Sequence, residues 1–336
     1  MQVSSHSPST ACQPTPKNPR TSSCILLGTE TNRHSKPPPG SRTRTITLQP
    51  LWEWRFESPH QSSSTLSSSG TASTSTALTI RLVSGTAERD GTELALNVPY
   101  TLPGTKSKIL TWQGCTLEVS GECDDHVAEY APADEPAHVS YLNLHHVLQS
   151  RRRQRPEAGA HAPPPPIHLP PRVLVCGGPY SGKSTLARTL TALATRQGSQ
   201  PCLVNLDPGE GLLSLPGTLS AAVFGGVMDA EAPEGGTGVG ASPSSGPGLV
   251  PVKLPIVYYY GRDRVEEEPG VWRAMVARLG KTVNSRLTED EASRDAGLIV
   301  DMPAVSGGEG VDLLAFAVEA FAGTFLRNYR WEPQLE

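Results

Sequence analysis

The stretch that decides the fold is GGPYSGKS, residues 177–184, which matches the pattern G-x-x-x-x-G-K-[ST] of a phosphate-binding loop. The apolar run VLVC at 173–176 precedes it, and STLARTLTALATRQG at 184–198 follows it with apolar residues at helical spacing. A strand, a glycine-rich turn and a helix in this order let successive backbone N–H groups and the helix N-terminus face phosphates. We therefore predict a nucleotide site, with a chance glycine-rich turn as the alternative.

The residue types in the loop suggest their roles. Lys183 is expected to bridge the β- and γ-phosphates, and Ser184 to hold Mg²⁺. Two acids end predicted strands, Asp207 in VNLDP and Asp301 in GLIVD, and such strand ends open beside the phosphate site of a doubly wound sheet. Asp207 could orient Mg²⁺ or act as a base toward an attacking hydroxyl. An acid before a turn is also a common turn former, so both interpretations stay open for both residues.

The region 172–336 alternates strand and helix patterns, with strands at CLVNLD (202–207) and GLIVDMP (297–303) and a helix at 311–326. This alternation predicts an α/β P-loop domain, a parallel sheet with flanking helices. A low-complexity insertion at 229–248 interrupts the pattern. The aromatic run at 258–260 is interpreted as a packed strand, with a base-stacking platform as the alternative.

The region 49–148 predicts a small all-β domain, because short alternating or apolar runs are broken by Gly, Pro and Asn. The runs are LWEWRFE (51–57), ALTIRLVSGTAE (77–88), TELALNVPYTL (92–102), SKILTWQGCTLEVSG (107–121) and HVSYLNLHHVL (138–148). A low-complexity insertion at 61–76 is expected to form a loop between the first two. The tryptophans at 52, 54 and 112 are expected to belong to the core of this domain.

Two other regions are expected to lie outside the cores. Residues 1–48 are rich in Ser, Thr and Pro with an excess of basic residues, which predicts a disordered tail; a basic arm that touches RNA is the alternative. Residues 149–171 join an Arg run at 151–153 to a proline run, which predicts a solvated helix end and a stiff linker. The Arg run could instead serve as a nuclear localisation patch or an RNA contact.

Composition excludes several classes of protein. The 336 residues include 32 Gly and 32 Pro and carry a net charge of −4, which lacks the basic footprint of a stand-alone nucleic-acid binder. The six cysteines show no CxxC spacing, which argues against a zinc site or a disulfide framework. No apolar run is long enough for a membrane span or a secretory signal. We therefore expect a soluble, intracellular protein.

Longer stretches carry a family resemblance. The segment SGKSTLARTLTALATRQGSQPCLVNLDPGEGLLSLPGTLSA (181–221) resembles the eukaryotic polynucleotide 5'-hydroxyl-kinase family that contains the Clp subunit of cleavage factor IA, in its fungal branch. The segments 84–104, 110–121 and 139–148 share this likeness, so that it runs from about Trp52 to Ala322 apart from the insertions. The resemblance implies an N-terminal β-sandwich, a P-loop domain and a C-terminal third domain.

The resemblance also implies a ligand. ATP would lie with its adenine end between the first two domains, and Asp207 falls on the acid that active relatives use to activate the RNA 5'-hydroxyl. Motif and resemblance together assign ATP and Mg²⁺ to Glu53, Lys106, Gly177, Tyr180, Ser181, Gly182, Lys183, Ser184 and Thr185, with the metal on Ser184.

Departures from the family pattern weigh against catalysis. Active kinases carry a Gln in an Asp-x-Gly-Gln motif and a Trp after the later strand, where this sequence has Gly209-Glu210 and Pro303-Ala304-Val305. The sequence ends at Glu336, before the strand, the arginine-bearing lid and the third domain that the family would add, so we expect the P-loop domain to be incomplete.

These observations lead to ranked hypotheses. The first is an ATP-binding subunit of the nuclear pre-mRNA cleavage and polyadenylation complex, with ATP as a structural ligand. Its implied partners are other subunits of cleavage factor IA, including the scaffold subunit that binds the RNA polymerase II tail, with a possible RNA contact and no membrane. The second is an active polynucleotide 5'-hydroxyl kinase. A GTPase or general ATPase switch is disfavoured because no Asn-Lys-x-Asp motif is present.

Overall fold

The structure is a computed structural model that describes residues 43–59, 77–130, 136–153, 170–231, 252–305 and 307–322. Both predicted insertions lie largely outside these residues, as do most of the predicted linker and both ends of the chain. Among the residues described, no helix has the length and apolarity that crossing a membrane would require.

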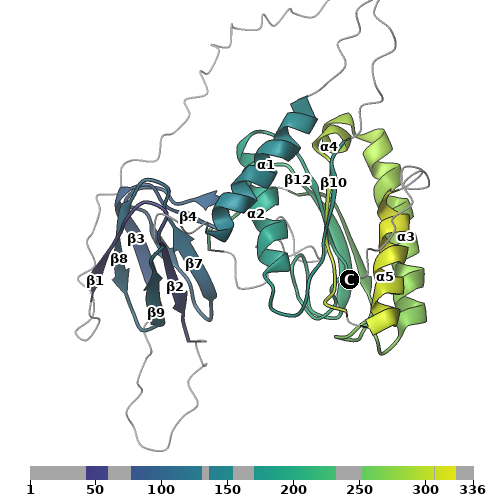
Figure 1. Cartoon of the computed structure of the whole chain (residues 1–336), viewed down its shortest axis with the longest axis horizontal. Coiled ribbons are helices and arrows are strands. Elements are labelled where there is room, and N and C mark those ends of the chain that lie inside the picture. The colour runs from purple at the N-terminus through teal and green to yellow at the C-terminus, as the bar shows by residue number, and fades with distance from the viewer. Residues whose placement is uncertain are drawn as a thin grey trace, which may run out of the picture. The chain divides into compact units, whose positions relative to one another are not determined.

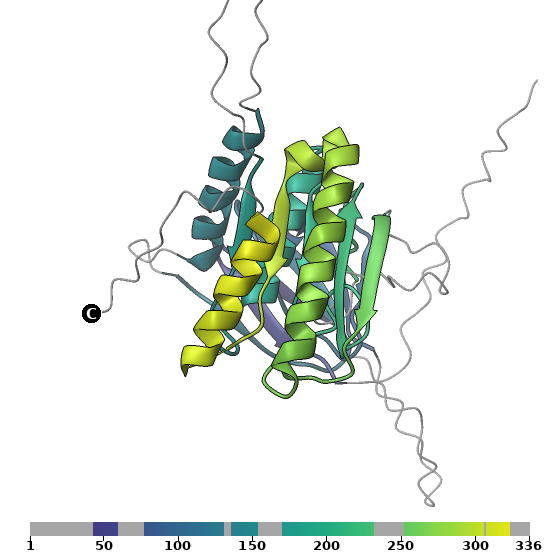
Figure 2. The ribbon, with the colours of Figure 1, turned by 90° about the vertical axis from the view of Figure 1, so that its right-hand side faces the viewer.

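The P-loop domain is built on a five-stranded sheet in the order β10-β14-β11-β12-β13. Its strands are β10 (Arg172–Val175), β11 (Cys202–Asn205), β12 (Thr218–Phe224), β13 (Val252–Tyr259) and β14 (Leu298–Asp301). Helices α1 (Ala137–Arg153) and α2 (Lys183–Arg196) lie on one face, and α3 (Pro269–Glu289) and α5 (Gly307–Ala322) on the other (Figures 1 and 2). The short α4 (Glu291–Ala296) leads into β14.

Alternating residues of the central strands supply both cores. Val204 and Val300 pack toward α3 and α5, whereas Leu203 and Ile299 pack toward α1 and α2. A strand that is covered on both faces reads as a continuous apolar run, as CLV and LIV do here. The expected α/β P-loop class is confirmed by this arrangement.

The sheet is mixed rather than wholly parallel. Strands β10, β14 and β11 are parallel, but β12 pairs antiparallel with β11, and β13 antiparallel with β12. No helix separates β11 from β12, and a short connection without a crossover can only reverse the chain direction. The sequence pattern identified the layers correctly, whereas strand direction depends on these connections.

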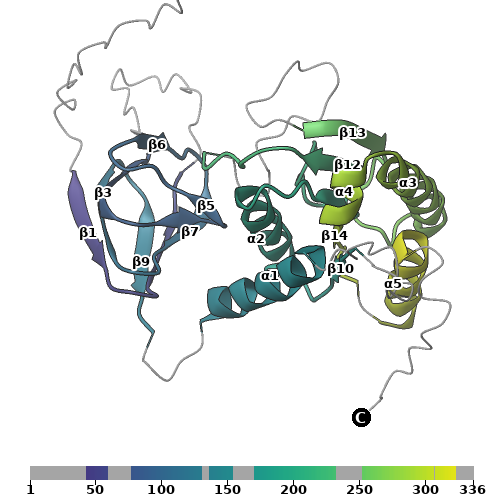
Figure 3. The same ribbon diagram turned by 90° about the horizontal axis from the view of Figure 1, so that it is seen from above.

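The N-terminal domain is a β-sandwich (Figure 3). One sheet has the order β1-β8-β3-β6, and the other β5-β4-β7-β2-β9. The strands are β1 (Arg44–Leu48), β2 (Glu53–Glu57), β3 (Thr79–Gly85), β4 (Glu88–Arg89), β5 (Thr92–Glu93), β6 (Pro99–Thr101), β7 (Lys106–Leu110), β8 (Cys115–Ser120) and β9 (Asp124–Ala128). Trp54, stacked on Phe56 with ring centroids 4.6 Å apart, is fully buried in its core, which confirms the expectation for that tryptophan.

The predicted disordered tail, residues 1–48, extends too far. Its last residues, Arg44–Leu48, form β1 against β8, with Leu48 buried in the core. Arg44, one of the basic residues considered for RNA, pairs with Asp125 at 2.6 Å. The sequence RTITL at 44–48 alternates as a strand should, but the Ser, Thr and Pro content of the preceding residues favours the prediction of a disordered tail.

The run HVSYLNLHHVL is helical, and its assignment to the all-β domain is therefore wrong. It forms most of α1, in which His138, His145 and Leu148 are buried at spacings of seven and three residues. These spacings place all three on one helix face, which packs partly on α2. The helix continues to Arg153, past the expected domain limit at 148.

The Arg run at the end of α1 has a structural contact. Arg152 donates from Nε to the carbonyl oxygen of Ala296, the last residue of α4, at 2.7 Å. A cation at a helix C-terminus is stabilised by unpaired carbonyl groups and by the helix dipole. This middle arginine is thus half-buried, whereas Arg151 and Arg153 are exposed.

Ion pairs join the β4–β5 turn to α2. Arg188 pairs with Asp90, both largely buried, and Arg196 pairs with Glu88 at 2.9 Å and with Glu93 at 2.9 Å. The turn itself approaches α2 closely, because a Cβ on Gly91 would lie 3.0 Å from the carbonyl oxygen of Thr189. The sandwich therefore contacts α2, the helix that follows the phosphate loop.

A second connection comes from the segment after β12. Ala230 is buried in the sandwich core and accepts a hydrogen bond from Nη1 of Arg89 at 2.6 Å. The next residue, Glu231, accepts from the backbone N–H of Thr101 in β6 at 2.5 Å. Ala230 and Glu231, at the start of the predicted insertion at 229–248, thus connect the P-loop domain to the sandwich.

Candidate nucleotide-binding site

The phosphate loop has a backbone that its sequence explains. Gly182 has φ +82° and Tyr180 φ +57°, so two left-handed residues turn the chain from β10 into α2. A Cβ on Gly177 would lie 2.6 Å from Oγ of Ser181, which donates to the carbonyl oxygen of Gly178 at 2.8 Å. A side chain at 177 would therefore displace the Ser181 hydroxyl from this hydrogen bond. Tyr180 is fully exposed at the tip of the loop.

The N-terminus of α2 is suited to an anion. Its N-cap, Gly182, offers no side chain to the first N–H groups, and the first turn contains no acid. Such N–H groups and the positive end of the helix dipole bind phosphate well. Lys183 lies in the same turn, with Nζ donating to the carbonyl oxygen of Gly178 at 3.2 Å, which holds the ammonium group at the loop.

Asp301 lies at the carboxyl end of β14, between the strands that lead to the other site residues. It is paired in register with Val175 of β10 and Asn205 of β11, and it is fully buried. Neither carboxylate oxygen makes a hydrogen bond of good geometry within the described part of the chain, although the Ser184 hydroxyl lies near enough to lower the pKa of the group. Burial raises the pKa of Asp301 to about 7, Glu210 and Asp207 act in the same direction, and Ser184 and Lys183 oppose them.

Asn205 shapes the loop that carries the other two acids. Its Nδ2 donates to the carbonyl oxygens of Asp207 and Glu210, each at 3.0 Å, and its Oδ1 accepts from the N–H of Asp207 at 3.0 Å. Burial raises the pKa of the Asp207 carboxyl, which the N–H of Gly209 partly offsets by donating at 3.0 Å. Glu210 turns back to α2, where its Oε2 accepts a hydrogen bond from the Ser184 hydroxyl.

These groups fit a small hard cation bound together with a polyphosphate. The described residues contain no set of three His, Cys, Asp or Glu side chains arranged to hold a metal unaided. Mg²⁺ commonly takes only one or two protein oxygens and completes its shell with water and phosphate. The Ser184 hydroxyl and the unpartnered oxygens of Asp301 offer that donor set, so the residues present fit Mg²⁺ with a nucleotide.

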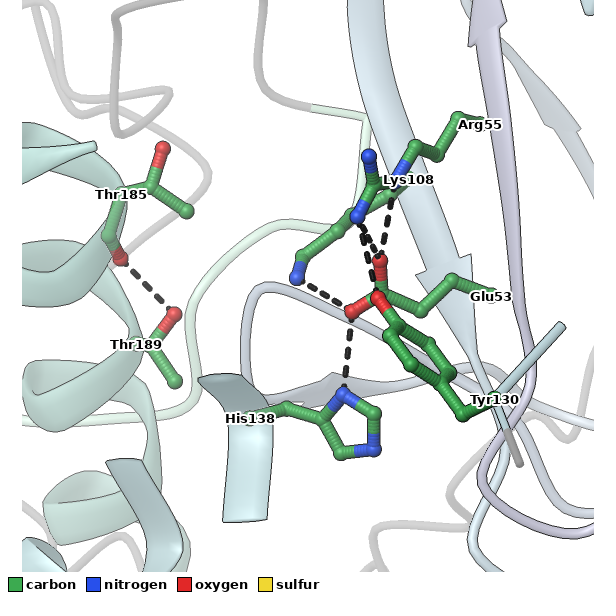
Figure 4. A network of polar contacts seen from close by, with 7 residues as sticks. All are labelled: Glu53, Arg55, Lys108, Tyr130, His138, Thr185 and Thr189. Atoms are coloured by element: carbon green, nitrogen blue, oxygen red, sulfur yellow. Dashed lines mark hydrogen bonds and ion pairs between the residues drawn. The ribbon is translucent and has the colours of Figure 1, made fainter. Parts of the chain in front are cut away.

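A second polar cluster lies in the sandwich around Glu53, which is fully buried (Figure 4). Its carboxylate accepts from Lys108 at 2.6 Å and from Arg55 at 2.9 and 3.0 Å, and its Oε1 lies 3.0 Å from Nδ1 of His138. Arg55 also donates to the hydroxyl of Tyr130 at 3.0 Å. Burial opposes ionisation of Glu53, but the contacts of His138, Lys108 and Arg55 hold its pKa well below the ordinary range.

Lys106, the other residue assigned to this end of the nucleotide, lies elsewhere. Its Nζ pairs with Glu57 at 2.9 Å, at the opposite end of β2 from Glu53, and both side chains are exposed. Lys108 approaches Glu53 instead. Lys106 and Lys108 are two residues apart on β7, so their side chains lie on the same face of the sheet but at different heights along the strand.

The Glu53 cluster borders the region of α2 that follows the phosphate loop. A narrow cavity is lined by residues from both domains, among them Lys108, Trp112, His138, Tyr141 and Thr189. Thr185 and Thr189 of α2 appear with the cluster in Figure 4, where the carbonyl oxygen of Thr185 accepts from the Thr189 hydroxyl at 2.8 Å. Lys108 and His138, which contact Glu53, thus line the same cavity as Thr189 of α2.

Several residues of the site escaped the sequence analysis. His138 and Tyr141 were assigned to a strand, and helical spacing in the same run was the signal that could have placed them together on α1. Asn205 was noted only as part of an apolar strand, although a buried amide before a loop rich in Pro and Gly signals a loop-forming role. Glu210 was noted only as a departure from a family pattern.

Comparison with known proteins agrees with the architecture. Residues 47–155 match the family described as the N-terminal beta-sandwich domain of polyadenylation factor, and residues 177–327 match the mRNA cleavage and polyadenylation factor CLP1 P-loop. The mRNA cleavage and polyadenylation factor CLP1 of Chaetomium globosum is 49% identical over 311 residues, which are 88% of this chain and 63% of the relative. The corresponding factor of Neurospora crassa is 47% identical, covering 86% and 62%.

Solved structures give the same result. The structure of a wild-type Clp1p–Pcf11p complex superposes with a TM-score of 0.67 at 25% identity, covering 84% of this chain and 59% of that one. A second structure, with the same TM-score and identity, is described as an extended interface between Pcf11p and Clp1p and the basis for ATP loss in a glycine-to-arginine mutant. The chain thus spans about three fifths of the length of its matched relatives. On the two domain matches and these relatives, the chain belongs to the CLP1 family of mRNA cleavage and polyadenylation factors.

Proposed function

We propose that this chain binds ATP with Mg²⁺. The observation that carries the proposal is the uncapped N-terminus of α2, with Lys183 in its first turn, facing a fully buried and unpartnered Asp301. The triphosphate would lie on residues 177–185, and the metal would be held by Ser184 and Asp301. When bound, Mg²⁺ would offset the negative charge of the phosphates and of the buried carboxylate.

We propose that the adenine end lies toward the Glu53 cluster, beside Lys108 and Trp112, outside a cavity that is itself too narrow for a base. Aromatic edges and a charged hydrogen-bonded network are suitable partners for a base and a ribose. Lys106, 66% exposed and paired with Glu57, is the less favoured contact, and we propose Lys108 in its place.

We propose that ATP serves as a structural ligand rather than a substrate. A nucleotide held by residues of both domains binds only the assembled fold, and so stabilises it by mass action. The ion pairs of α2 with the β4–β5 turn describe the same interface. The position that active kinases fill with Gln is held here by Glu210, which contacts Ser184.

The wider role is proposed from the relatives. They are named mRNA cleavage and polyadenylation factors, and the solved relative Clp1p was determined in complex with Pcf11p. We propose that the chain is a nuclear subunit of pre-mRNA 3'-end processing that docks a Pcf11p-like partner of cleavage factor IA. Binding of the chain to such a partner in a pull-down from purified components, with nuclear localisation of a tagged chain, is the expected result.

The experiment on the site measures retained nucleotide. The purified chain is denatured, and the released nucleotide is identified by chromatography; about one equivalent of intact ATP is expected. Lys183→Ala should release none, whereas Lys281→Ala, which removes an exposed lysine on α3, should release as much as the wild type. A wild-type chain that carries no ATP and binds none on addition would contradict the proposal.

A second arm tests kinase activity, for which Asp207 would be the base. The chain is incubated with γ-labelled ATP and an RNA oligonucleotide with a 5'-hydroxyl end. The structural-ligand proposal expects unlabelled RNA. Label transfer that Lys183→Ala and Asp207→Asn both abolish would replace the proposal with the kinase.

A further inference from the structure

The side chain of Glu210 contacts the Ser184 hydroxyl, which is the proposed ligand of the metal. Its Oε2 accepts a hydrogen bond from the hydroxyl of Ser184, and its carbonyl oxygen is fixed by Nδ2 of Asn205 at 3.0 Å. The backbone position of Glu210 is therefore set by Asn205 of β11, while its exposed carboxylate is hydrogen-bonded to α2. An acid has thus been placed at the metal end of the phosphate loop by a defined backbone contact.

The charge of Glu210 adds to that of two other acids. Asp301 is fully buried with both oxygens unpartnered, and Asp207 lies in the same loop as Glu210. Carboxylates near the phosphates of a nucleotide repel them, and a divalent cation between the two sets of charges removes this repulsion. The opposing cation in the protein is Lys183, which lies at the loop.

We propose that Glu210 makes nucleotide binding by this chain dependent on a divalent cation. This inference rests on the proposed ATP site and assigns a determinant within it. Without the metal, the Glu210 carboxylate accepts the hydrogen bond of the Ser184 hydroxyl and would repel the γ-phosphate end of the nucleotide. When a metal is bound, the Ser184 hydroxyl would be available to hold it, and the Glu210 carboxylate would add negative potential that favours the cation. Binding of metal and of nucleotide then strengthen each other reciprocally.

Glu210→Gln tests this role, because it removes the charge and keeps a side chain of the same size with a hydrogen-bond acceptor for Ser184. Calorimetric titration with ATP is carried out on nucleotide-free protein, once in EDTA and once in excess Mg²⁺. The ratio of the two dissociation constants measures the coupling. Removing one charge at an exposed position beside the phosphate loop is expected to reduce this ratio about tenfold, or about 1.4 kcal/mol.

The reduction should arise mainly from tighter binding of ATP in EDTA. Glu319→Gln, which makes the same chemical change at an exposed position on α5, should keep the wild-type ratio. Equal thermal midpoints for the three proteins without nucleotide confirm that all are folded, so that the ratios report on the site.

The outcomes separate this inference from the function on which it rests. A wild-type protein that binds ATP with strong coupling, and a Glu210→Gln variant with weakened coupling, supports it. If Glu210→Gln keeps the wild-type ratio, or weakens binding equally with and without Mg²⁺, the inference is overturned while the ATP site stands. If the wild type binds no ATP in either buffer, the proposed function itself fails, and this inference with it.

Discussion

Replacing Glu53 with Gln should destabilise the chain strongly, because a buried network of charges would lose its only anion. Lys108, Arg55 and His138 all contact this fully buried carboxylate, at 2.6 to 3.0 Å. A Gln keeps one acceptor oxygen but turns an N–H₂ group toward donors. Neutralising one partner of a buried ion pair costs about 3–5 kcal/mol, and because Arg55 is half-exposed we expect Glu53→Gln to fall at the lower end of this range.

A control lies four residues away on the same strand. Glu57→Gln makes the same chemical change in an ion pair with Lys106 at 2.9 Å, but that pair is exposed, and exposed pairs contribute about 0–1 kcal/mol. The assay is urea unfolding followed by fluorescence of Trp54 and the other tryptophans, with the slope checked for constancy. Equal costs for the two variants would refute the argument that the buried cluster holds this end of the sandwich.

The same network sets a dependence on pH. Because the folded-state pKa of Glu53 lies below its unfolded value, its contribution to stability is present above about pH 4.5 and is lost as the pH falls below that value. Glu53→Gln should therefore lose less stability than the wild type on acidification. If the free energies of unfolding of the two proteins fall equally as the pH is lowered, the assignment of Glu53 as an ionised, hydrogen-bonded carboxylate is contradicted.

Three further predictions follow from single side chains or glycines. His145 is buried, and burial is the main cause that lowers its pKa to about 4. As the pH falls the unfolded chain takes up a proton before the folded one, so the free energy of unfolding should fall by up to about 3 kcal/mol between pH 6.5 and 4. In thermal melts over this pH range, His145→Leu should remove the loss, whereas His146→Gln, at an exposed neighbour, should keep it. Asp90→Asn leaves Arg188 with less compensation at the domain contact, so a lower urea midpoint by an amount equivalent to about 2–4 kcal/mol is expected, and an unchanged midpoint would contradict a stabilising contact. Gly182→Ala meets no atom closer than 3.8 Å but requires φ +82°, so a backbone cost of about 1–2 kcal/mol should appear as reduced ATP retention with the fold intact, and full retention would show that the loop tolerates the change.

The part of the fold that sequence could predict is the part with local signals. The phosphate loop contains its own steric explanation in Gly177 and Gly182, and the periodicity of β10, β11 and β14 is visible in short apolar runs. Strand direction in β12 and β13 depends on how the chain returns, which no local pattern encodes. The helix α1 was mistaken for a strand because its exposed Val147 and buried His145 give little amphipathic contrast.

The site divides in the same way. Lys183, Ser184 and Asp301 follow from motif and strand end, but the contacts of Glu53 depend on pairing across β2 and β7, and on α1 reaching the sandwich. The register of that pairing placed Lys108, and not Lys106, beside Glu53. A one-dimensional spacing cannot decide between two lysines that share a strand face.

The most direct test of the proposed site is a crystal structure of the chain with ATP and Mn²⁺, in which the anomalous signal of the metal locates it independently of the protein atoms. We predict one peak close to the γ-phosphate end of ATP and to the side chains of Ser184 and Asp301, with the adenine toward Glu53. A nucleotide bound away from residues 177–185, or a metal that contacts neither Ser184 nor Asp301, would contradict it.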